Sequence, residues 1–132
     1  MAAPTVRTPE ERAAEAAAHA HEAMARASIP EMAGFLQELA GQRTVALMVG
    51  IKNPKAVGQW ARNEREPHGS TAQHLRDAYQ VARLLCAVFP RQVVQNWLLG
   101  MNPYLDDDAP ALHIAQEPQA VLRAAKAFVA VG

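Results

Sequence analysis

The hydrophobic and polar positions of this chain follow the period of helices rather than of strands. Apolar side chains recur at spacings of three and four residues, and no stretch of Val, Ile, Thr and aromatic residues alternates convincingly with a period of two. Half of the residues are apolar, which is enough for a packed core, while aromatic residues make up only 5%. The pattern therefore predicts an all-α protein whose helices pack closely.

Two capping boxes predict where the first two helices begin. The first helix follows Thr8 and is rich in alanine. Its apolar stripe is mostly alanine, so we expect it to bury little and to form an exposed or partner-bound arm that is partly disordered. The second helix follows Ser28, with Glu31 completing the capping box, and Gly41 ends it.

The sequence "TVALMVGIKNPKAVGQWARNE", residues 44–64, predicts two short helices joined by a tight turn. Gly50 ends the first helix, and Asn53 caps the second. This arrangement is typical of a helix-turn-helix, in which Val57 and Trp60 would point inward. An ordinary helical hairpin with a solvated basic face is the alternative. The outward face would present Lys55, Ala56, Gln59, Arg62 and Asn63.

The net charge is zero, but the charges are unevenly distributed along the chain. Residues 42–91 carry eight basic and three acidic side chains, a net charge of +5, while residues 1–41 and 92–132 carry −3 and −2. A basic middle between acidic ends indicates a polyanion as the partner of the middle only. With a helix-turn-helix in this region we expect that partner to be double-stranded DNA, because Lys and Arg suit phosphates or guanine edges while Gln and Asn suit adenine. The expected DNA-binding residues are Thr44, Lys52, Asn53, Lys55, Gln59, Arg62 and Asn63.

The second half of the chain predicts a long helix and several shorter ones. Ser70 and Gln73 are expected to cap the long helix, whose apolar pattern continues to Phe89. The later helices are expected to begin at Pro90, Pro110 and Pro118. The apolar stripe of the last helix comprises Val121, Leu122, Ala125, Phe128 and Val129. Two roles are open for this stripe: it closes the protein's own core or dimer, or it docks in a partner's cleft. If it docks in a partner's cleft, a chain that ends at Ala124 is expected to stay folded.

Several residues of this half follow a family pattern, in the order Trp97-Leu98, Asn102-Pro103, Leu105, Pro110 with Leu112, and Val121 to Phe128. In this order and spacing the segment resembles the toxin-binding domain of the Xre/MbcA/ParS family of antitoxins. "NPKAVGQW", residues 53–60, is similar to the start of that family's recognition helix. The resemblance covers residues 30–132 and implies a helix-turn-helix followed by a small helical partner-binding domain.

The resemblance implies an antitoxin of a type II toxin-antitoxin system. Such a protein binds and blocks a RES-domain toxin that degrades NAD, and it binds its own operator DNA. The toxin-binding residues implied are Asn102, Tyr104, Arg123, Lys126 and Phe128. The regions would be the arm 1–28, the helix-turn-helix 29–69 and the toxin-binding and dimerisation domain 70–132. The alternatives are a stand-alone repressor, such as a phage or prophage immunity regulator, and an adaptor that binds no DNA.

The sequence contains no motif that indicates catalysis, nucleotide binding or metal binding. No catalytic triad order, Walker loop or nucleotide fingerprint occurs, and the histidines are not spaced to share a metal. We therefore expect no enzyme activity, no cofactor and no metal. The lone Cys86 lies in an apolar run and is expected to be a buried small hydrophobe in a cytoplasmic protein. With no apolar run of membrane-spanning length we expect no membrane contact, and we expect a homodimer or a larger assembly.

Overall fold

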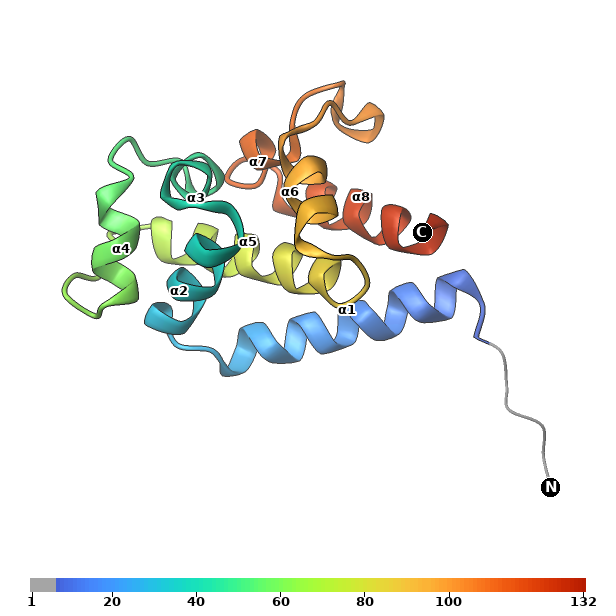
Figure 1. The fold of residues 1–132 in the computed structure, drawn as a ribbon, viewed down its shortest axis with the longest axis horizontal. Helices are drawn as coiled ribbons and strands as arrows, with labels where there is room; N and C mark the ends of the chain where they lie inside the picture. Colours follow the sequence, from blue (N-terminus) through green and yellow to red (C-terminus); the bar gives the residue numbers. More distant parts are fainter. Residues whose placement is uncertain (1–6) are drawn as a thin grey trace.

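The computed structural model describes residues 7–132, and within them the chain forms helices and no strand (Figure 1). The predicted all-α class is therefore confirmed. The helices are α1 (Pro9–Arg26), α2 (Ile29–Ala40), α3 (Gln42–Val49), α4 (Lys55–Ala61), α5 (Thr71–Cys86), α6 (Arg91–Leu99), the short 3₁₀ helix η1 (Pro103–Leu105), α7 (Pro110–His113) and α8 (Pro118–Val131).

The first two helices begin at the predicted capping boxes. Thr8 Oγ1 accepts a hydrogen bond from the backbone N–H of Glu11 at 3.0 Å. Ser28 Oγ accepts one from the N–H of Glu31 at 3.3 Å and donates to the Glu31 carboxylate at 3.0 Å. Both cap residues have extended backbone, which is the conformation that places a hydroxyl over the first turn of a helix.

The predicted cap of α5 is wrong. Ser70 makes no side-chain capping hydrogen bond, and its backbone has the helical angles φ −73° and ψ −8° rather than extended ones. Gln73 Nε2 donates instead to Asp77 Oδ1 at 3.0 Å, one helical turn further on. The N-terminus of α5 is consequently left without a side-chain cap.

Helix α5 lies at the centre of the molecule and packs against α1, α2, α3, α6 and α8 (Figure 1). Leu75, Ala82 and Leu85 are completely buried there. The helix ends at Cys86, earlier than its apolar pattern predicted. Pro90 disfavours helical backbone in the residue before it, so Phe89 leaves the helix. The Phe89 ring packs on Phe128 of α8 instead, at a centroid distance of 4.6 Å.

Helix α1 belongs to the core, so the expectation that its alanine stripe buries little is wrong. Ala13, Ala16 and Ala20 are at most 7% exposed and pack where α1 runs along α5 and α8. Small side chains allow helix axes to approach closely, and this approach buries the stripe. The part of the predicted arm before residue 7 lies outside the described residues.

The apolar stripe of α8 closes the protein's own core. Val121, Ala125 and Val129 are at most 1% exposed, against α5 and α1. Phe128 is half-buried between Phe89 and Trp97. This packing favours the account in which the stripe closes the protein's own core, and under that account a chain ending at Ala124 should unfold.

The buried side chains of all the helices from α1 to α8 form one continuous cluster across the predicted region boundaries at 28 and 69. None of the helices in residues 7–132 is both long and apolar enough to cross a membrane. Because residues of both α4 and α8 belong to this cluster, the core holds the two helices in fixed positions, well apart from one another (Figure 1).

Candidate nucleic-acid interface and candidate docking groove

Helices α3 and α4 are joined by a five-residue turn, residues 50–54, that begins at a left-handed glycine. Gly50 has φ 75° and ψ 33°, a conformation that costs a glycine little because it has no Cβ. The following N–H, of Ile51, donates to the Ala46 carbonyl at 3.0 Å and closes the end of α3. The glycine thus redirects the chain so that both helices pack on α2.

The second helix of this pair starts one residue later than the sequence predicted. Asn53 Oδ1 accepts a hydrogen bond from the N–H of Lys55 at 3.1 Å, and Pro54 already has helical backbone angles. The assigned helix begins at Lys55, so Asn53 lies one residue earlier than an ideal cap while supplying the expected hydrogen bond. This turn holds Lys52 and Lys55 on the outside of the molecule.

The inward face of α4 is wider than predicted. Val57 and Trp60 are buried, at 0% and 2% exposure, as expected for a helix-turn-helix. Ala56, expected on the outward face, is buried as well, at 5%, because α4 crosses α2 closely. Gly58 is buried beside Gln42 of α3, where an added Cβ would come within 2.5 Å of the Gln42 side chain. The atom met is the end of the flexible Gln42 side chain, so a residue larger than glycine would require that side chain to move.

The predicted DNA-binding residues are not all exposed. Lys52, Asn53, Lys55, Arg62 and Asn63 are exposed, whereas Thr44 and Gln59 are half-buried. Because α4 ends at Ala61, Asn63 lies past the helix rather than on its face. Its φ of 57° is left-handed, a conformation that Asn tolerates better than most residues.

Two charged residues after α4 change the electrostatics of this surface. Arg62 Nε and Nη2 donate to the two carboxylate oxygens of Glu64, at 3.0 and 3.1 Å. This hydrogen bonding and the opposite charge raise the pKa of Arg62 and lower that of Glu64. Arg65 Nη1 donates to Gln59 Oε1 at 3.3 Å. Roles for Glu64 and Arg65 were not predicted from the sequence, because no helical spacing places them beside their partners.

An apolar groove of about 270 Å³ lies between the end of α6, η1 and the last turns of α8. Met101, Tyr104 and Val131 at its rim are 83%, 74% and 86% exposed. The residues that line it are Trp97, Met101, Asn102, Pro103, Tyr104, Ala124, Ala127, Phe128 and Val131. Of the predicted toxin-binding residues, Asn102, Tyr104 and Phe128 meet here. Arg123 and Lys126 are exposed on α8 but do not line the groove.

Hydrogen bonds shape the loop that carries this groove. Asn102 is buried, and its Oδ1 accepts from the N–H of Tyr104 at 3.0 Å. The N–H of Asn102 donates to the Asp108 carbonyl at 3.2 Å. His113 Nε2 lies 2.9 Å from Asp108 Oδ2, and its Nδ1 lies 3.6 Å from Glu117 Oε2. The hydrogen bond to Asp108 and the two negative charges raise the pKa of His113.

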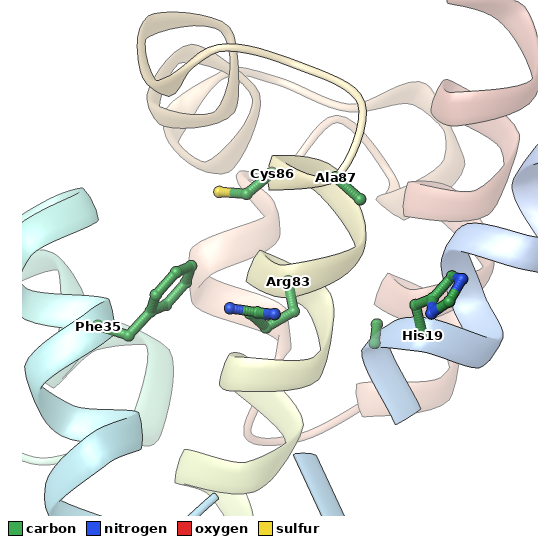
Figure 2. A pocket seen from close by; sticks show the side chains of 6 residues that line it. His19, Phe35, Arg83, Cys86 and Ala87 are labelled. Atoms are coloured by element: carbon green, nitrogen blue, oxygen red, sulfur yellow. The ribbon is translucent and has the colours of Figure 1, made fainter. Parts of the chain in front are cut away.

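A separate hollow of about 280 Å³ lies between α1, α2 and α5 (Figure 2). Figure 2 shows Arg83 of α5 reaching toward Phe35 of α2, and the guanidinium carbon lies 5.3 Å from that ring's centroid. Cys86 is half-buried at the same hollow, and burial raises the pKa of its thiol. A raised pKa disfavours the reactive thiolate, in keeping with an apolar packing role.

In comparisons of the chain with protein-family models, with curated proteins and with solved structures, no match was found. Function is therefore inferred from the two surfaces described above, the exposed lysines around α4 and the groove beside α8.

Proposed function

We propose that this chain is an antitoxin that binds its own operator DNA through α3 and α4 and blocks a RES-domain toxin through the groove beside α8. The observation that carries the proposal is the α3–α4 pair. Two short helices meet at a left-handed Gly50, with Val57 and Trp60 buried between them and α2. A buried contact of this kind between two short helices is what a helix-turn-helix needs in order to present its second helix to the major groove, and it supports the proposal.

The charge at the start of α4 supports DNA as the partner. Lys52 and Lys55 are exposed on either side of the Asn53 turn. Lysines in this position bind backbone phosphates and set the orientation of the helix. Gln59, the other polar side chain of α4, is half-buried and accepts a hydrogen bond from Arg65. A dimer would place two such helices about one DNA turn apart. The Arg62 charge is balanced by Glu64, whereas Lys52 and Lys55 form no salt bridge with any described residue and remain available to a phosphate.

The groove supports a protein as the second partner. Met101 and Tyr104 are largely exposed around an apolar floor, and aromatic residues and methionine are enriched at protein interfaces. The groove is lined by residues of α6, η1 and α8, and α6 and α8 lie well away from α4 (Figure 1). DNA and a toxin would therefore bind at the same time without touching one another.

One observation favours the alternative of a stand-alone repressor. Since α8 packs in the core, its apolar stripe is occupied and is not free to fill a toxin's cleft. In that alternative the groove would pair with a second copy of the chain, and no toxin would be needed.

Co-expression tests the proposal. Cells that express a RES-type toxin encoded beside this chain's reading frame should regain their NAD when the chain is co-expressed. The double variant Met101→Ala/Tyr104→Ala should lose this protection and keep operator binding, while Leu112→Ala, an equally apolar change outside the groove, should keep both. Operator binding by a wild-type chain that gives no protection would contradict the antitoxin role and favour the repressor.

A further inference from the structure

A hollow of about 320 Å³ lies beside α4, between the turn before this helix and the loop that leads to α5. Lys52, Asn53, Arg65 and His68 contribute to its walls, and none of the described residues that line it is acidic. Asn53 Oδ1 is already used by the N–H of Lys55, so its amide offers donors to the hollow. The hollow is thus rich in donors and positive charge.

Trp60 borders the same hollow and carries an unused donor. The side chain is 2% exposed, and within residues 7–132 its Nε1 has no hydrogen-bond partner. Buried donors without a partner are rare in folded proteins, so each calls for an explanation. Because Nε1 itself is closed off from solvent, a molecule in the hollow would lie near this donor without accepting its hydrogen bond.

The start of α5 adds to the attraction for an anion. Thr71, the first residue of this 16-residue helix, lines the hollow, and Ser70 does not cap the helix. The N-terminus of a helix carries a partial positive charge, which favours phosphate. The N–H of Thr71 itself already donates to the His68 carbonyl at 3.1 Å, so this contribution is electrostatic. Ile51 and Pro67 provide apolar surface beside these groups.

We propose that this hollow binds a small phosphate monoester with a flat apolar body, of the kind represented by a nucleoside monophosphate. The phosphate lies between Lys52 and Arg65, whose two positive charges match a group that carries nearly two negative charges at neutral pH. The flat body lies on Pro67 and Ile51, beside the Trp60 ring. The volume is that of the smaller ligand sites in proteins, which start at about 300 Å³.

This ligand would regulate the proposed DNA surface. Lys52 and Asn53 belong both to the hollow and to the exposed turn before α4. A phosphate held by Lys52 withdraws that lysine from a DNA phosphate, so ligand and operator compete. Only this consequence rests on the proposed function, and ligand binding itself does not.

Nuclear magnetic resonance of the full-length ¹⁵N-labelled chain tests the site without DNA. The sequence has two tryptophans, so two indole N–H signals are expected, and a Trp97→Phe variant assigns them. Adenosine monophosphate should shift the Trp60 signal in a saturable manner and leave the Trp97 signal in place. Inorganic phosphate should give a smaller shift, and adenosine should give none.

A matched pair of variants makes the test specific. Lys52→Ala/Arg65→Ala should weaken binding of adenosine monophosphate about tenfold or more, because the phosphate then has neither of its charge-assisted hydrogen-bond donors. Arg12→Ala/Arg91→Ala removes the same charge from exposed positions outside the hollow and should leave the affinity unchanged. Equal weakening in the two variants, or an unchanged Trp60 signal, would overturn the proposal. A Trp60 shift caused by duplex DNA but by neither phosphate probe would also overturn it and assign the hollow to the DNA surface.

Discussion

The guanidinium of Arg62 forms a two-pronged ion pair with the carboxylate of Glu64, with N–O distances of 3.0 and 3.1 Å. Both side chains are well exposed, so the pair contributes little to stability. Its main effect is electrostatic. The positive charge that the sequence places at the end of α4 is cancelled two residues later, and Glu64 competes with any phosphate for Arg62.

Replacing Glu64 by Gln should therefore strengthen binding to duplex DNA. The released Arg62 becomes free to bind a phosphate, and the slope of log affinity against log salt should steepen by about 0.9. Fluorescence anisotropy with a labelled duplex at several salt concentrations measures both quantities.

Glu66→Gln is the control, because it removes the same charge from a neighbouring exposed residue that makes no ion pair with Arg62. Glu64→Gln should also have a smaller effect when Arg62 is already Ala. An equal increase in affinity from both glutamate substitutions would attribute the effect to net charge alone.

The groove beside α8 should contain a binding hot spot at Tyr104. Tyr104→Ala should weaken binding of a RES-domain toxin by about 2 kcal/mol or more, roughly 30-fold in Kd, because aromatic residues at the centre of interfaces commonly contribute that much. The side chain is 74% exposed, so the thermal midpoint should stay nearly unchanged. Calorimetric titration against purified toxin, with Leu112→Ala as control, measures the change in affinity. Equal affinities for both variants would exclude Tyr104 as an anchor.

Helix α1 should contribute to global stability. Ala16 is 7% exposed where α1 packs in the core, so Ala16→Leu should overpack this interface and cost about 1–3 kcal/mol of unfolding free energy. Ala18 is exposed on the same helix, and Ala18→Leu should change stability by less than about 0.5 kcal/mol. Urea unfolding of both variants makes the comparison. Identical midpoints would mean that α1 does not pack on α5 and α8 in solution.

Stability should depend on pH through His113. Asp108 and Glu117 raise the pKa of its folded state above the ordinary value of about 6.5. The stabilisation is fully present below the unfolded-state pKa and is lost as the pH rises through the raised, folded-state pKa. The unfolding free energy of the wild type should fall over this window, and His113→Gln should remove that part of the fall. The same pH dependence in both proteins would assign it to other groups.

Local signals in the sequence predicted local structure well. The caps at Thr8 and Ser28 and the glycine turn at Gly50 depend on residues that are neighbours in the chain, so the pattern alone sufficed. Ser70 failed as a cap because its backbone conformation is set by the preceding loop rather than by the residue type.

Burial that depends on distant helices was not predictable in the same way. Nothing in the local sequence marks Ala16 of α1 or Ala56 of α4 as buried, because alanine suits an exposed helix equally well. They are buried because α1 lies along α5 and because α4 crosses α2. The rim of the groove likewise combines Met101 and Val131, which lie thirty residues apart in the sequence.

DNA binding by α4 is tested most directly by the salt dependence of binding to the duplex upstream of this chain's own reading frame. Lys52→Ala/Lys55→Ala removes the two exposed lysines at the start of α4, and Arg12→Ala/Arg91→Ala removes equal charge elsewhere. We predict that the lysine variant binds the duplex more weakly. Its slope of log affinity against log salt should be shallower by about 0.9 for each phosphate no longer neutralised. The arginine variant should have the affinity and the slope of the wild type. Unchanged affinity and slope in the lysine variant would show that α4 and its turn do not bind DNA and would contradict the proposed function.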